Sequence, residues 1–121
     1  MNDKAERPAA WVGHVVVAAS DIAESAAFYL ALGMRQVEQN DRVAVLELRG
    51  GTHLVVVEGE PTPGASFDLM VEDLDRTHAE WTSAGLEPSP IERGRIHDKF
   101  RVTDPAGTVV EINSTHVIGP V

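Results

Sequence analysis

Residues 13–34 read GHVVVAASDIAESAAFYLALGM, and this stretch carries the signals of one strand followed by one helix. Its apolar, β-branched beginning is typical of a buried strand. Asp21 then stands where a helix N-cap is expected, with Glu24 three residues later as in a capping box. Gly33 ends the helical pattern at a position where helices commonly adopt left-handed geometry. The stretch therefore predicts a strand, a helix over 21–32 and a sharp stop.

A second stretch, residues 66–86, repeats this pattern. It reads SFDLMVEDLDRTHAEWTSAGL and predicts a second helix over 73–84. Equivalent residues lie 52 positions apart in the pairs Asp21 and Asp73, Ile22 and Leu74, Tyr29 and Trp81, and Gly33 and Gly85. Self-similarity at a fixed spacing indicates an internal duplication. Because Tyr29 and Trp81 recur on the apolar helical face, we predict that both lie in the core and do not stack on a cofactor.

Strand-like segments follow both predicted helices. They read MRQVEQ, RVAVLEL and HLVVVEG in the first half, and LEPSPIE, DKFRVTD and TVVEINS in the second. The chain thus predicts an N-terminal tail (1–10) and a single α+β domain (11–118) of two βαβββ modules, 11–58 and 66–115, joined by the Pro/Gly-rich linker 59–65. A helix covers only one face of such a sheet, so we expect the modules to pair and the protein to be a homodimer.

The composition excludes several kinds of partner. With 121 residues and a net charge of −9, the chain lacks the basic surface that nucleic acids require. No apolar run approaches the roughly 18 residues of a membrane span. The first residues lack the basic-then-apolar pattern of a signal peptide, so we expect a cytoplasmic protein with no membrane partner. The absence of cysteine excludes thiol nucleophiles and thiolate metal ligands.

The order and spacing of these elements resemble the vicinal-oxygen-chelate superfamily, which includes glyoxalase I, bleomycin-resistance proteins and extradiol dioxygenases. The most specific marks are the opening stretch and FRVTDPAGTVVEI, residues 100–112. The resemblance covers nearly all of residues 11–115. It implies two βαβββ modules whose sheets form a curved, cup-shaped cavity, and a dimer that exchanges modules in some members.

Strand alternation assigns side chains to the predicted cup. If the hairpin turns close evenly, Phe100 lies opposite Glu111, and Leu46 opposes His53. The predicted ligand-binding residues are His14, Val16, Leu46, His53, Val55, Ser66, Asp68, Met70, Phe100, Val102, Val109 and Glu111. Most of them are apolar, with a few polar groups among them, which is typical of a small-molecule pocket.

The resemblance implies that metal-binding relatives use four cup positions, which fall here on His14, Val55, Ser66 and Glu111. Valine cannot coordinate a metal, and a serine hydroxyl is a poor substitute for imidazole or carboxylate. A catalytic metal site generally needs about three protein ligands, so we expect no metal and no other cofactor. The alternative is a divalent metal held by His14, His53 and Glu111, which requires a local bulge to bring His53 toward the other two.

Together these features favour a protein that sequesters a small apolar, aromatic or cationic molecule, as the resistance branch of the family does. One alternative is a metal-dependent lyase, isomerase, dioxygenase or thiol transferase of the glyoxalase type. Another is a metal-free enzyme with Glu111 or His14 as the catalytic acid or base. The sequence leaves open whether a reaction is catalysed. In each case we expect Glu111 to face the pocket, paired with His14 or gripping the polar end of a ligand.

Overall fold

The computed structural model describes residues 6–117 and 119–121. The elements of the first module are β1 (His14–Ala19), α1 (Ile22–Ala31), β2 (Arg35–Gln39), β3 (Val43–Glu47), a short 3-10 turn (Arg49–Gly51) and β4 (His53–Glu58). Those of the second are β5 (Gly64–Val71), α2 (Leu74–Ser83), β6 (Lys99–Thr103) and β7 (Val109–Ser114). The predicted linker 59–65 ends two residues late, because β5 already begins at Gly64. The start of the predicted tail (1–5) and the predicted domain end at residue 118 lie outside the described residues.

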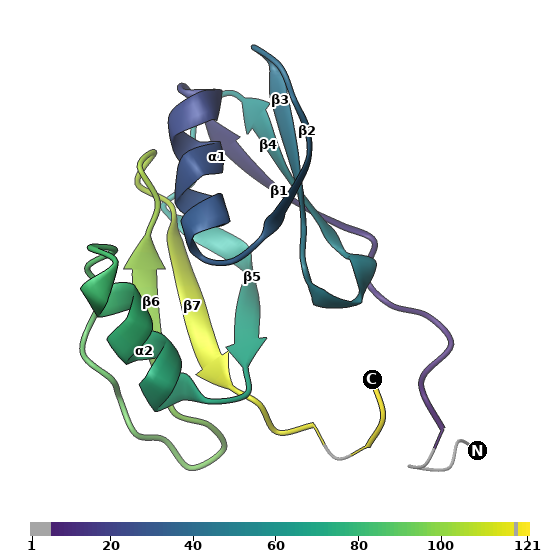
Figure 1. The fold of residues 1–121 in the computed structure, drawn as a ribbon, viewed down its shortest axis with the longest axis vertical. Helices are drawn as coiled ribbons and strands as arrows, with labels where there is room; N and C mark the ends of the chain where they lie inside the picture. The colour runs from purple at the N-terminus through teal and green to yellow at the C-terminus, as the bar shows by residue number, and fades with distance from the viewer. Residues whose placement is uncertain (1–5, 118) are drawn as a thin grey trace.

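Each module forms its own sheet with a helix beside it (Figure 1). The strand order is β1-β4-β3-β2 in the first sheet and β5-β7-β6 in the second. In both sheets the first strand of the module runs parallel to the last one, and the strand before the last runs antiparallel to it. The predicted α+β fold of two related modules is confirmed.

Both helices begin and end where the sequence predicts, within one residue. The Asp21 carboxylate accepts the N–H of Glu24 at 3.0 Å, and Asp73 caps α2 by accepting the N–H of Arg76 at 3.0 Å. Gly33 follows α1 with a φ of 106°, the left-handed geometry that a glycine adopts at little cost. Among the described residues, neither helix has the length and apolar character to cross a membrane.

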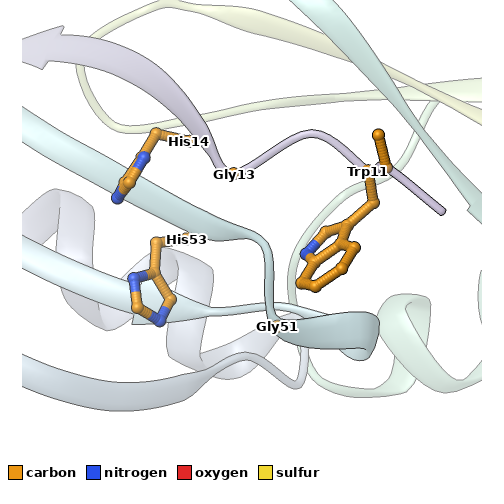
Figure 2. A pocket seen from close by; sticks show the side chains of 6 residues that line it. Trp11, Gly13, His14, Gly51 and His53 are labelled. Carbon is orange, nitrogen blue, oxygen red and sulfur yellow. The ribbon is translucent and has the colours of Figure 1, made fainter.

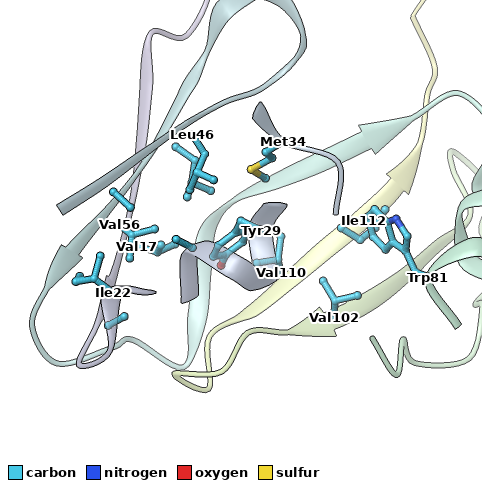
Figure 3. Close-up of a cluster of buried hydrophobic side chains, with 14 of the residues drawn as sticks. Val17, Ile22, Tyr29, Met34, Leu46, Val56, Trp81, Val102, Val110 and Ile112 are labelled. Carbon is cyan, nitrogen blue, oxygen red and sulfur yellow. The ribbon is translucent and has the colours of Figure 1, made fainter. Parts of the chain in front are cut away.

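One hydrophobic core joins the two modules (Figure 3). Tyr29 on α1 is fully buried, and Trp81 on α2 is 8% exposed, so the prediction that both are core residues is confirmed. Trp81 packs edge-to-face against Phe100 with ring centroids 5.7 Å apart. The sheets contribute the buried side chains Val17, Ala19, Ala44, Leu46, Leu54, Val56, Val102, Val110 and Ile112.

A buried hydrogen bond also links the modules. The Tyr29 hydroxyl donates to the Asp104 carboxylate at 2.8 Å, and the same carboxylate accepts the N–H groups of Ala106 and Thr108 at 3.0 and 2.9 Å. Burial, reinforced by the hydrogen bond to Asp104 and by its charge, raises the pKa of Tyr29 far above its usual value. The phenol therefore stays neutral and keeps its proton to donate.

The loop between β6 and β7 comprises residues 104–108, because Thr103 pairs with Val109. It is one residue longer than the turn of residues 104–107 that the predicted register assumed. The Asp104 N–H donates to the Thr108 carbonyl at 2.9 Å, and the Gly107 N–H donates back to the Asp104 carbonyl at 2.9 Å. Gly107 has a φ of 97°, and a left-handed glycine at this point inserts the extra residue. As a result Thr103 opposes Val109, and the predicted register is wrong by one position.

The first module contains the same five-residue loop between β3 and β4. Here the Leu48 N–H donates to the Thr52 carbonyl at 2.8 Å, and Gly51 has a φ of 93°. Glu47 consequently opposes His53. The prediction that both turns close evenly therefore misses one residue in each of them.

A shift of one residue turns a strand over, so three predicted cup residues lie in the core instead. Leu46 and Phe100 are fully buried, and Val102 is 1% exposed. Phe100 opposes Ile112, while Arg101 takes its predicted place opposite Glu111. The prediction that Leu46, Phe100 and Val102 line a ligand pocket is therefore wrong.

The segment LEPSPIE (86–92), predicted as a strand, forms only an isolated bridge. That bridge joins Glu92 to Lys99, and the Ser89 N–H donates to the Arg101 carbonyl at 2.9 Å. Two prolines in this segment lack the N–H that a continuous strand needs at each ladder position. The second sheet therefore has three strands.

Candidate functional site

The first sheet has one face that neither helix covers, and we call it the β1–β4 face. Its side chains are His14 and Val16 of β1, Val45 and Glu47 of β3, and His53 and Val55 of β4, as the strand register places them. Val16 is 54% exposed, and Val55 is half-buried. Four of the predicted ligand-binding residues, His14, Val16, His53 and Val55, thus gather on this face together with Glu47.

A recess opens at the end of this face where β1 and β4 begin. It has a volume of about 390 Å³ and is lined by Ala10, Trp11, Gly13, His14, Gly51 and His53. Figure 2 shows the two imidazoles on neighbouring strands and the indole of Trp11 beside Gly51. We call this hollow the Trp11 recess.

The two histidines are held in a defined arrangement. Their rings meet edge-to-face with centroids 5.7 Å apart. The Nε2 atom of His53 lies 3.1 Å from a carboxylate oxygen of Glu47, and Glu47 also binds Arg35 through its other oxygen. Glu47 therefore orients the His53 ring at the edge of the recess.

The second sheet also has an uncovered face, which we call the β5–β7 face. It carries Ser66, Asp68, Met70, Lys99, Arg101, Val109 and Glu111. Met70 is 47% exposed. Asp68 accepts a hydrogen bond from the side-chain amide of Asn113 at 2.7 Å. Five predicted ligand-binding residues share this face, so the predicted set is split between two sheets.

Glu111 lies between two cations. Its carboxylate is 3.7 Å from the Arg101 guanidinium and 3.9 Å from the Lys99 ammonium, and its side chain is 36% exposed. Arg101 also binds Glu92 at 2.7 Å. Among the described residues, the ionic contacts of Glu111 are therefore with its own sheet, and the predicted pairing with His14 does not form within the chain.

Comparison with known proteins fits this architecture. The sequence model of the Glyoxalase/Bleomycin resistance protein/Dioxygenase superfamily matches residues 11–112. The chain belongs to this superfamily. No curated protein matches it significantly by sequence.

Solved structures of the superfamily share the fold at low identity. A lactoylglutathione lyase from Agrobacterium tumefaciens is 17% identical, with a TM-score of 0.73 over 90% of this chain and 96% of the other. A bleomycin-binding protein from Streptomyces verticillus, complexed with copper(II)-bleomycin, is 21% identical, with a TM-score of 0.72 over 91% and 100%. A glyoxalase/bleomycin resistance protein from Catenulispora acidiphila is 26% identical, with a TM-score of 0.73 over 88% and 99%. Proteins with this fold thus include both a lyase and a binding protein.

The residues at the superfamily's metal positions do not fit a metal. Val55 offers no donor atom and Ser66 only a hydroxyl, so two of the four positions, His14 and Glu111, carry a strong metal donor. Within the described part of the chain, no three His, Asp or Glu side chains are placed to share an ion. The bulge that would have moved His53 is also absent, because β1 and β4 pair without interruption from His14 and His53 onward. We therefore derive no chemistry through a metal.

Sequence reasoning missed five residues of these faces and the recess. Val45, Glu47, Lys99 and Arg101 were hidden by the register error, and the glycines before Thr52 and Thr108 were the signal that could have revealed it. Trp11 precedes the first strand pattern, so no periodicity pointed to it.

Proposed function

We propose that the chain binds a small molecule with an apolar or aromatic body, without a resident metal, in a cup that two copies of the chain complete together. The β1–β4 face of one copy faces the β5–β7 face of the other. The observation that carries this proposal is the division of the predicted ligand residues between two uncovered sheet faces. Each face leaves an apolar side chain about half exposed, Val16 on one and Met70 on the other.

Burial of apolar area supports pairing of the faces. Removing apolar surface from water contributes roughly 25 cal/mol per Å², and large exposed apolar patches commonly mark interaction sites. The helices already cover the opposite side of each sheet, so a second copy or a ligand is what remains to cover these faces. A homodimer with two equivalent cups satisfies both modules at once.

The two walls of this cup differ, and the difference describes the ligand. Val16, Val45 and Val55 form an apolar wall, whereas Glu111 with Lys99 and Arg101 forms a charged one. A ligand that fits has an apolar body and one polar or charged end. The structurally similar bleomycin-binding protein from Streptomyces verticillus supports a sequestering role, because it binds a small molecule.

The cations beside Glu111 support binding without a metal. The Arg101 guanidinium and the Lys99 ammonium both lie within 4 Å of the same Glu111 carboxylate oxygen. A divalent ion bound to this carboxylate would therefore lie close to both cations. Like charges at such distances repel each other strongly where water is excluded. Lys99 and Arg101 thus supply the positive charge that an ion would supply in a metal-binding relative.

The first experiment finds a ligand and tests the charged wall. Aromatic and cationic natural products are screened by thermal shift, and hits are titrated calorimetrically against the wild type and Glu111→Gln. A charge-assisted hydrogen bond is worth roughly 1.5–3 kcal/mol, so the variant should bind about ten- to a hundredfold more weakly. Equal affinities would remove Glu111 from the site.

The second experiment tests the shared cup by mixing two variants, each of which has one damaged wall and binds the ligand poorly by itself. His14→Ala damages only the β1–β4 face and Glu111→Ala only the β5–β7 face. When the two proteins are mixed and allowed to exchange, one cup of each mixed dimer has two intact walls. Random pairing predicts recovery of about a quarter of the wild-type sites. No recovery, or a sedimentation coefficient of a single chain at micromolar concentration, would contradict the proposal.

A further inference from the structure

The Trp11 recess carries an inference about the ligand. We propose that Trp11, His14 and His53 hold a planar aromatic ring, so that the bound molecule is an aromatic compound whose ring lies in this recess. The inference rests on the proposed small-molecule function and adds a ligand class to it.

Trp11 has no packing role that explains it. Its side chain is 70% exposed, whereas Trp81, the other tryptophan, is 8% exposed and packs on Phe100. An indole left largely in water is unusual for a residue that serves only the fold. Tryptophan is, in contrast, among the side chains most enriched where proteins bind partners.

The backbone next to Trp11 is fixed to the sheet. The Thr52 hydroxyl donates to the Val12 carbonyl at 2.6 Å, and the His53 N–H donates to the Gly13 carbonyl at 2.8 Å. These two bonds hold the residues that follow Trp11 against the start of β4. The indole is therefore presented from an anchored segment, beside Gly51 and the two imidazoles (Figure 2).

Two glycines line the recess. A Cβ atom on Gly51 would lie 4.0 Å from the indole nitrogen of Trp11, and one on Gly13 would meet no atom within 4 Å. Both glycines line the hollow, so its wall there is backbone. With glycine at both, the three rings of Trp11, His14 and His53 and a strip of bare backbone form the walls.

The walls suit a flat aromatic ring. Aromatic rings prefer offset-stacked or edge-to-face contacts with one another, and the recess offers both an exposed indole face and imidazole edges. Its volume of about 390 Å³ falls in the range of small-molecule sites. His14 and His53 also begin the strands that carry Val16 and Val55, so a ring in the recess continues directly onto the apolar wall of the cup.

The experiment uses the isotope-labelled full chain and a matched pair of probes. Naphthalene-2-methanol and its fully saturated decahydro analogue have the same carbon skeleton, but only the first is planar and aromatic. Both are titrated while the two indole N–H signals are followed by NMR, with Trp11→Leu assigning the signals. We expect the aromatic probe to shift the Trp11 signal and leave that of Trp81 in place, and to bind at least fivefold more tightly than the saturated one.

Two variants separate recognition of an aromatic ring from non-specific hydrophobic binding. Trp11→Leu should weaken the aromatic probe about five- to tenfold and change the saturated one less than twofold, since leucine keeps the apolar contact. Ile96→Ala, at another exposed apolar side chain, is the matched control and should change neither. Equal binding of both probes, or an unmoved Trp11 signal, would overturn the inference.

Two further outcomes keep this inference distinct from the proposed function. A Trp11 signal that shifts with protein concentration alone would mean that a second copy covers the indole, and the ring site would then be wrong while the shared cup stands. Aromatic binding at Trp11 without recovery in the mixed dimers of His14→Ala and Glu111→Ala would have the opposite meaning. The recess would then bind rings, and the shared cup would be wrong.

Discussion

On the β1–β4 face the central strand pair presents Val45 opposite Val55, whereas the same place on the β5–β7 face holds Arg101 opposite Glu111. The sides that face the helices show no such contrast, because Leu46 pairs with Leu54 in one module and Val102 with Val110 in the other. Packing under a helix demands apolar residues in both modules. No helix packs on the uncovered faces, so packing does not require apolar residues there. The side chains on these faces therefore indicate what the protein binds.

The largest expected difference in stability is between variants of two neighbouring β6 residues whose side chains lie on opposite faces of the sheet. Phe100→Ala removes a fully buried ring from beneath α2 and should lower the free energy of unfolding by about 3–5 kcal/mol. Arg101→Ala removes a half-exposed side chain with surface ion pairs and should lower it by about 1 kcal/mol or less. Urea unfolding of both variants measures the difference. A larger loss for Arg101→Ala would mean that the strand is turned the other way.

The hydrogen bond that joins the modules should have the next largest effect. Tyr29→Phe deprives the buried Asp104 carboxylate of a donor and should cost about 1.5–3 kcal/mol in urea unfolding. A smaller loss than about 0.5 kcal/mol would mean that the modules do not depend on this contact.

The same residue gives the protein a defined alkaline limit. The fold raises the pKa of Tyr29, while the unfolded chain releases this proton near pH 10. The stabilisation by the neutral phenol is therefore complete below about pH 10 and is lost as the pH rises further. Tyr29 is the only tyrosine in the chain, so ultraviolet absorbance of tyrosinate should rise only as the protein unfolds. Ionisation in the folded state near pH 10 would contradict the buried hydrogen bond.

A variant can give the cup the donors that the two faces lack. Val55→Glu with Ser66→His completes four donors together with His14 and Glu111, and Arg101→Ala removes a competing cation. The triple variant should bind Zn²⁺ about tenfold or more tightly than the wild type, measured by calorimetry on protein freed of metal. One tightly bound metal per wild-type chain, lost on His14→Ala, would instead restore the metal-site alternative.

The smallest effect should be the same in both modules. Gly51→Ala and Gly107→Ala each place a Cβ on a left-handed residue and should cost about 1–2 kcal/mol by thermal unfolding. Equal losses of stability would confirm that the two loops set the strand register in the same way. A negligible loss at one of them would mean that this loop can close in another way.

The sequence predicted the elements that depend on local chemistry. The Asp21 and Asp73 caps and the helix-ending Gly33 and Gly85 are each encoded within a few residues, and their recurrence 52 positions apart points to the second module. Strand register is different, because it depends on how many residues a turn contains. The turn residues Asp104–Gly107 suggest an even count, and the hydrogen bonds of the folded loop show that Thr108 also belongs to it.

The candidate site was predictable to the same extent. His14, Val16, Val55 and Glu111 follow from alternation along strands that the repeat had already located. Their distribution over two separate faces does not follow from alternation, since it depends on how the modules pack through Tyr29 and the shared core. The Trp11 recess depends on a segment without any periodic pattern.

The five-residue loop makes β6 sensitive to chain length in a way that no point substitution reproduces. Deleting Thr108 leaves four residues for the turn, and an even closure then rotates the whole strand by half a turn about its axis. Lys99 and Arg101 would then face α2, and Phe100 and Val102 would face water. The deletion of one residue would thus exchange the two faces of the whole strand. The connection before β6 is paired with it through the bridge between Glu92 and Lys99, so residues removed around the exposed Ile96 would disturb that bridge and leave the pairing of β6 with β7 in place.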